Sequence, residues 1–221
     1  ERYAALLRYH DASWINLWNA TSAYYHALRG ETDNIPELFS QHRLSDINML
    51  APGKPMMKMI ENQVYLAQGA YAKVVGRSAE LLAVCEAMHY ALVALHIRIQ
   101  TAAAYAMLDK QAEAIRLLSP ALREAEQDGL ALPFAENYRY LAPLLQGCPQ
   151  DTFFRQVTAL GAEMTRHCDE LCQRSTTPAI FAELSERERE ICTLIAARLT
   201  NREIGEKLYL SEGSIKQYSN Q

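Results

Sequence analysis

The chain has 221 residues, five cysteines and a formal net charge of −4. This length can bury a sizeable core and suits one medium domain with a small domain beside it. No apolar run reaches the ~20 residues that a membrane-spanning helix requires. The odd number of cysteines, without secreted-type spacing or a signal-like start, favours a reducing cytoplasm over a disulfide-stabilised secreted protein.

Residues 1–175 carry a helical pattern almost throughout. Alanine, leucine and methionine recur at spacings of three and four residues, and no stretch shows sustained strand alternation. The sequence therefore predicts an all-α protein. It begins with Glu1 rather than methionine, in what reads as the middle of a helix, so we expect a piece of a longer protein.

Three segments share one pattern at intervals of about forty residues. The clearest is residues 108–122, LDKQAEAIRLLSPAL, where a turn is followed by a helix and Tyr105 precedes the turn. Residues 67–82, preceded by Tyr65, fit the same pattern, and residues 28–43 fit it least well. A fixed period of this kind is typical of repeat architectures.

These segments resemble tetratricopeptide repeats, with Tyr65 and Tyr105 where such repeats place a tyrosine. Their period is longer than the usual ~34 residues and is similar to that of the superhelical repeats in MalT-like regulators, which are large LuxR-type activators that sense a small inducer. The resemblance implies a curved solenoid in which neighbouring helix pairs bury their apolar faces against one another. Residues 1–172 would then form a sensor or interaction domain.

The first helix of each tetratricopeptide pair lines the concave side of the array. The repeat register places the following residues on that side: Tyr24, Gln63, Leu66, His96, Ala103 and Met107. Trp14 and Trp18 lie one helical turn apart and could stack a sugar or another flat ligand, although packing against a neighbouring helix is the favoured alternative. For His96 the alternative is a packed or hydrogen-bonded histidine. The candidate effector-binding residues are Trp14, Trp18, Tyr24, Gln63 and His96.

Motifs of enzymatic sites are missing from the chain. It contains no Walker-type phosphate-binding loop, no GxSxG, no HExxH and no paired CxxC. MalT-like proteins carry a nucleotide-binding domain upstream of their repeats, and nothing of it occurs in this sequence. Cys168 and Cys172 beside His167 lack a second ligand pair, which favours a structural role over a metal site. We therefore predict no enzymatic activity, no metal and no cofactor for the chain.

Prolines punctuate the end of the helical region. Residues 134–145 and 153–172 are predicted as further helices that continue or cap the array, set off by Pro133, Pro143 and a turn at residues 147–149. The polar stretch that follows contains a proline as well. We predict that it is a linker, over residues 173–183, to a second domain.

Residues 184–221 contain three helix starts. Ser185 is followed three residues later by Glu188, and Thr200 by Glu203, and each pair is a capping box. Ser211 offers a third N-cap. Helices this short cannot stand alone, so we expect them to share a core. The apolar residues on their faces are Ile191, Leu194, Ile195, Leu199, Ile204, Leu208 and Ile215.

This segment resembles the LuxR-type (GerE-like) helix-turn-helix of bacterial transcription regulators. The resemblance rests on LSEREREICTLIAARLTNREI and LYLSEGSIK in register. It implies a supporting helix over residues 201–208 and a recognition helix from Ser211 onward, lying in the major groove of double-stranded DNA. The residues that it assigns to DNA contact are Arg202, Ser211, Ser214, Lys216, Gln217 and Asn220.

Two features depart from the family pattern. Arg198 stands where the family usually has a glycine in a left-handed turn, which costs other residues about 1 kcal/mol. The recognition helix runs out at Gln221, and the family's following helix, which commonly mediates dimerisation, is absent. We therefore expect the module, over residues 184–221, to be truncated at its C-terminus.

The net charge of this module limits how strongly it can attract DNA. Residues 184–221 hold six Lys/Arg and six Asp/Glu, so the whole net charge of −4 lies in residues 1–183. A module without net charge attracts DNA phosphates weakly. Tight binding is therefore expected to need a dimer, a higher oligomer or several adjacent sites.

Two functions are consistent with this organisation. In the first, the chain is a transcription regulator whose helical array senses a small-molecule inducer or a protein partner and whose helix-turn-helix binds promoter DNA. In the second, it is a helical-repeat scaffold that binds another protein, with the terminal module serving assembly. The LTNREI and LSEGSIK motifs favour the first.

Overall fold

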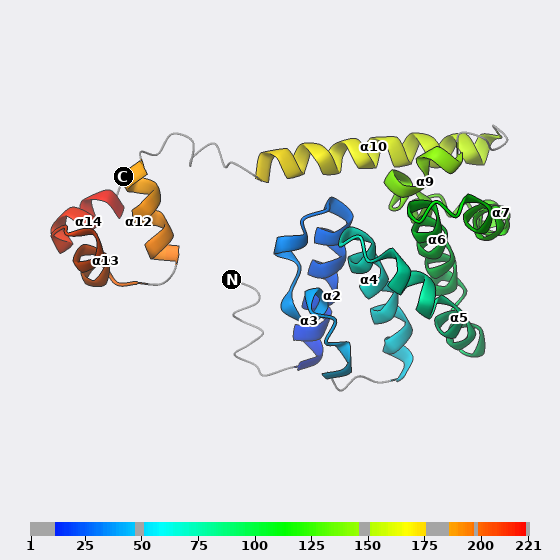
Figure 1. Cartoon of the computed structure of the whole chain (residues 1–221), viewed down its shortest axis with the longest axis horizontal. Helices are drawn as coiled ribbons and strands as arrows, with labels where there is room; N and C mark the ends of the chain where they lie inside the picture. The colour runs from blue at the N-terminus through cyan, green and yellow to red at the C-terminus, as the bar shows by residue number, and fades with distance from the viewer. Residues whose placement is uncertain (1–11, 47–50, 146–150, 176–185, 197–198, 220–221) are drawn as a thin grey trace. The chain divides into compact units, whose positions relative to one another are not determined.

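The structure of the protein is a computed structural model, shown in Figure 1, and it describes residues 12–46, 51–145, 151–175, 186–196 and 199–219. Over these ranges all regular elements are helical, which confirms the predicted all-α class. The chain divides into two compact units, residues 1–172 and 173–221. None of the helices in the described ranges is both long enough and apolar enough to span a bilayer.

The first helix that the structure describes is α2 (Ala12–Arg29), and the described residues from 30 to 53 contain only short elements. Gly30, with φ 75°, ends α2, and Pro36 precedes the four-residue α3. Both residues break a helix, because one adopts a left-handed backbone and the other has no amide to donate. The predicted second helix of the first repeat is therefore reduced to α3. The short elements are η1 (Thr32–Asn34), α3 (Glu37–Ser40), η2 (Leu44–Asp46) and η3 (Ala51–Gly53).

Four helices of similar length follow, and α5, α6 and α7 start twenty residues apart. The predicted segment at residues 67–82 coincides with a turn and α5, and the one at residues 108–122 coincides with a turn and α7. The forty-residue period of the sequence therefore contains two helices, each with its own turn. The bounds are α4 (Lys54–Ala67), α5 (Tyr71–Ala87), α6 (Ala91–Met107) and α7 (Gln111–Asp128).

A residue in the left-handed region follows each of these four helices. Gly69, His89, Asp109 and Gly129 have φ between 55° and 73° and lie at intervals of twenty residues. At all four ends the next amide donates to the carbonyl five residues back, at 2.8–2.9 Å. This bond belongs to the Schellman cap, which satisfies carbonyls that a helix end would leave unpaired. The four helices thus end in the same way, although only two ends use glycine.

Helix α6 lies at the centre of the first unit. It contacts α4, α5, α7, α8 (Leu132–Ala135) and α9 (Tyr138–Leu145). One cluster of buried apolar residues runs from α4 through α6 and α7 to α10 (Thr152–Ser175), and a second joins α2, α4 and α6. The buried apolar residues of α6 are Ala94, Leu95, Ile97, Ile99, Ala102, Ala103 and Ala104.

The last helices of the first unit pack closely. A Cβ added at Gly161 of α10 would lie 2.4 Å from Cγ of Tyr138 in α9, so only glycine fits there without movement. The single helix predicted over residues 134–145 is divided into α8 and α9, and Pro143 lies inside α9, between the buried Leu141 and Leu144. Helix α10 continues to Ser175, so the predicted linker begins inside a helix.

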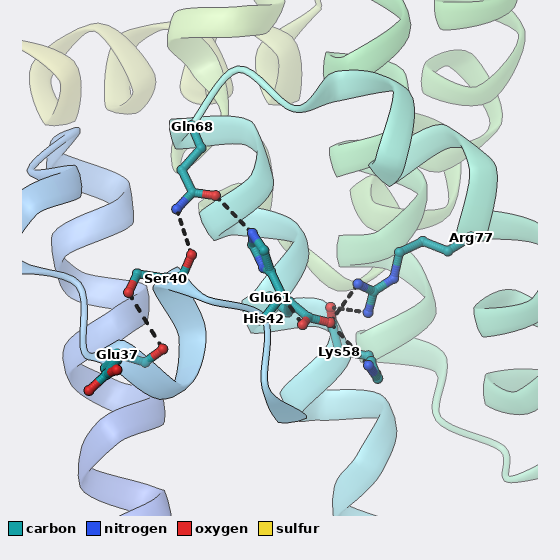
Figure 2. A network of polar contacts seen from close by, with 7 residues as sticks. All are labelled: Glu37, Ser40, His42, Lys58, Glu61, Gln68 and Arg77. Atoms are coloured by element: carbon teal, nitrogen blue, oxygen red, sulfur yellow. Dashed lines mark hydrogen bonds and ion pairs between the residues drawn. The ribbon is translucent and has the colours of Figure 1, made fainter. Parts of the chain in front are cut away.

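A buried carboxylate joins α4, α5 and the segment after α3 (Figure 2). Glu61 is 1% exposed, and its oxygens lie 2.5 Å from Nη1 of Arg77, 3.1 Å from Nζ of Lys58 and 3.8 Å from Nδ1 of His42. The His42 ring also stacks on Tyr65, with 3.9 Å between centroids, and burial lowers the pKa of His42. These contacts hold His42, and with it the chain directly after α3, against α4 and α5.

Candidate nucleic-acid interface

Three short helices surround one small core in the described residues from 186 to 219. They are α12 (Glu186–Ala196), α13 (Asn201–Leu208) and α14 (Glu212–Ser219). Isolated helices of this length are marginal in water, so their stability comes from packing on one another. Ile195 was expected in the core but is 41% exposed. It lies about 40° around α12 from Ile191, on the side away from Leu194, and Leu194 is the residue that packs against the core. The core residues are Ile191, Ile204, Leu208 and Ile215, with Leu194, Leu199 and Leu210 packed against them.

A capping box begins α13, as the sequence predicts. The amide of Glu203 donates to Oγ1 of Thr200 at 3.3 Å, and the amide of Thr200 donates to Oε2 of Glu203 at 2.8 Å. Hydrogen bonding from the backbone of Thr200, and next from its hydroxyl, lowers the pKa of Glu203. Two amides at the start of the helix are satisfied in this way. Ser185, from the other predicted box, lies outside the described residues.

Ser211 begins α14, which confirms the third predicted cap. The amide of Ser214 donates to Oγ of Ser211 at 3.1 Å, and the two hydroxyl oxygens are 2.8 Å apart. The cap fixes the residue at which the helix starts, and Ile215 then turns into the core. Lys216, the next residue, is exposed.

The turn between α13 and α14 is held from two sides. Tyr209 follows α13 with φ 55° and ψ 41°, and the amide of Leu210 donates to the carbonyl of Gly205 at 2.9 Å. The guanidinium of Arg187, from α12, donates to the carbonyl of Leu208. A cation at this helix end satisfies a carbonyl and complements the helix dipole. Two short helices are thereby joined by a tight, anchored turn, as in DNA-binding helix-turn-helix proteins.

Comparison with known families identifies this unit. Residues 182–221 match the family described as bacterial regulatory proteins, luxR family (GerE). The second unit is a LuxR-type helix-turn-helix domain. The match covers 40 of the 221 residues and supports a DNA-binding transcription regulator. No curated protein and no solved structure matches the chain.

Those predicted DNA-contact residues that the structure describes lie on α13, on α14 and at the cap of α14. Ser211 caps α14, and Ser214 and Lys216 lie on that helix. Arg202 is exposed on α13, where its Nε lies 3.2 Å from Oε1 of Glu206. Exposed ion pairs of this kind are weak, so the guanidinium can exchange its partner for a phosphate. Arg198, Asn220 and the side chain of Gln217 lie outside the described residues.

The predicted effector-binding residues of the first unit differ in exposure. Trp14 and Trp18 are 57% and 41% exposed on α2. Gln63 is buried, and its Oε1 accepts from Nε2 of Gln100 at 3.0 Å. Both tryptophans thus expose surface to solvent, and Gln63 is hydrogen-bonded to Gln100.

Tyr24 and His96 meet at a carboxylate that the sequence analysis did not single out. The Tyr24 hydroxyl donates to Oε2 of Glu136 at 2.5 Å, and Nδ1 of His96 lies 3.6 Å from the same oxygen. Burial lowers the pKa of His96 to about 4 and raises the pKa of Glu136. The sequence offered one sign of this role, because Glu136 is the single acidic residue in the largely apolar stretch of residues 130–145. The cluster links α2 to the end of α8, 112 positions apart in the chain.

Proposed function

We propose that the chain is the sensing and DNA-binding part of a transcription regulator. The LuxR-type domain binds promoter DNA, and the first unit responds to an effector or to a protein partner. The family match over residues 182–221 carries the proposal. The capped start of α14 and its anchored turn support it, because a recognition helix must be held rigidly on its supporting helix.

DNA reading is assigned to the exposed side of α14. Lys216 adjoins the buried Ile215, so its ammonium projects from the domain, and lysine can pair with guanine or with a phosphate. The domain has as many acidic as basic residues over residues 184–221. Its affinity therefore depends on a few specific contacts, and we propose that two or more copies bind adjacent sites.

Selection of duplexes from a random pool by the wild-type protein tests this function. Fluorescence anisotropy with a selected duplex and its scrambled counterpart then measures affinity and specificity. The Lys216→Ala variant is expected to bind about 1–3 kcal/mol more weakly and to lower the salt slope by about 1 per copy. Lys110→Ala, which removes an exposed lysine from the first unit, is the control. Failure of the wild type to enrich any sequence would contradict the proposal.

We propose a tetratricopeptide-like array as the sensor. The identical caps that follow α4, α5, α6 and α7 support a repeated helix-and-turn unit. Because Trp14 and Trp18 are exposed while Tyr24 and His96 are engaged with Glu136, an effector is expected to contact the tryptophans first. A thermal-shift screen with sugars, metabolites and peptides, followed by tryptophan quenching, tests this site.

The exposed side of α2 also favours a second function. Trp14, Leu17 and Trp18 form an apolar face there, and contiguous exposed apolar residues often mark protein-binding surfaces. In this alternative the chain is a scaffold and the terminal domain serves assembly. Stabilisation by a protein partner alone, together with failure to select DNA, would favour the scaffold.

A further inference from the structure

Tyr209 is the most exposed large hydrophobic residue in the described part of the chain, with 96% of its surface accessible. It lies between Leu208 and Leu210, which both pack in the core of the LuxR-type domain. Its backbone is left-handed, a conformation that glycine adopts with less strain. Neither burial nor backbone preference therefore explains an aromatic side chain at this position.

The position of Tyr209 relates it to the start of the recognition helix. It precedes the Ser211 cap by two residues, so the two Cα atoms are at most about 7.6 Å apart. The N-terminal residues of a recognition helix contact base edges in the major groove, which is about 12 Å wide and bordered by phosphates. When α14 enters the groove, the phenol ring is within reach of the DNA backbone at the groove edge.

The backbone that carries the ring is held in place. The Leu210 amide bonds to the Gly205 carbonyl at 2.9 Å, and Arg187 bonds to the Leu208 carbonyl, so both residues flanking Tyr209 are anchored. A ring on an anchored turn loses little backbone freedom on binding, which favours a contact made there.

We propose that Tyr209 is a DNA-backbone contact: its hydroxyl donates to a phosphate oxygen, and its ring packs on the adjacent sugar. The inference rests on the proposed DNA-binding function. Tyrosine hydroxyls are among the donors that proteins use toward phosphates. A neutral donor suits a domain that holds six basic and six acidic residues, because it adds affinity without adding charge.

Two substitutions in the full chain separate the hydroxyl from the ring. Tyr209→Phe removes only the hydroxyl, and Tyr209→Gly removes the ring while favouring the left-handed backbone. With the selected duplex, we expect about three- to tenfold weaker binding for the phenylalanine variant and a larger loss for the glycine variant. The salt slope should be unchanged for both, because a neutral side chain releases no counterions, whereas Lys216→Ala should lower it.

The melting temperature distinguishes a lost contact from a lost fold. Tyr209→Gly should melt at the wild-type temperature or above it, and Tyr25→Ala, which removes a half-exposed tyrosine from the first unit, should bind DNA like the wild type. Wild-type affinity in Tyr209→Gly, or weaker binding matched by a lower melting temperature, would overturn the contact. Wild-type affinity in Tyr209→Phe would overturn the phosphate hydrogen bond. If the wild type binds no duplex, the proposed function itself fails.

Discussion

His96 should govern how the first unit responds to mild acid. Its side chain is 14% exposed on α6, and burial lowers its pKa from 6.5 to about 4. The 3.6 Å from Nδ1 to Oε2 of Glu136 is too long for a good hydrogen bond, and that oxygen already accepts from Tyr24. The carboxylate therefore does not compensate for burial, and the folded protein holds the imidazole neutral.

The sign of the effect follows from the lowered pKa. Neutral His96 stabilises the fold fully above pH 6.5, and this contribution is lost as the pH falls toward 4. At about 1.4 kcal/mol per pKa unit, His96 alone accounts for a loss of about 3 kcal/mol in the free energy of unfolding. Glu136 acts in the opposite direction, because its raised pKa makes its protonated form stabilising as the pH falls. His42, whose pKa burial also lowers, acts in the same direction as His96, so the pH dependence of the wild type alone does not isolate His96.

Comparison with His96→Gln isolates the histidine. Urea unfolding should be followed by tryptophan fluorescence, since both tryptophans lie in α2 and report on the first unit. Between pH 7 and pH 4, the stability of the wild type relative to His96→Gln should fall by about 3 kcal/mol. His167→Gln, which changes an exposed histidine of α10, should leave the pH dependence of the wild type in place. If the wild type and His96→Gln differ in free energy of unfolding by the same amount at pH 7 and at pH 4, the role assigned to His96 is refuted.

Two further substitutions test the packing of each unit. Gly161→Ala should destabilise the first unit by about 1–3 kcal/mol, because the added Cβ would clash with Cβ and Cγ of Tyr138. These atoms are close to the backbone and cannot move aside as the end of a flexible side chain could. A melting temperature equal to that of the wild type would contradict this packing. Thr200→Ala should cost the LuxR-type domain about 1 kcal/mol by removing the oxygen that accepts from the Glu203 amide, whereas Thr200→Ser should retain most of the stability. Equal melting temperatures for the alanine and serine variants would show that the Thr200 cap does not stabilise the domain.

The helix starts of the LuxR-type domain could be predicted because capping is local chemistry. Thr200 and Glu203 are three residues apart, as are Ser211 and Ser214, so their bonds depend on a single turn of backbone. The second and third repeat segments were predictable for a similar reason, since apolar spacing within one helix reveals its buried face. The caps at His89 and Asp109 could not be predicted, because neither residue type indicates a left-handed backbone as strongly as glycine does.

The sequence by itself determined the all-α class, the helix starts near the C-terminus and the family of residues 182–221, because these depend on residues within a few turns of one another. Tertiary structure alone decided that Tyr24 and His96 meet at Glu136, which is 112 positions from Tyr24 in the chain. It likewise decided that Gln63 accepts a hydrogen bond from Gln100. It also decided that the two tryptophans of α2 are exposed. Burial and partners of this kind follow from which helices pack together, and periodicity within one helix does not specify its neighbours.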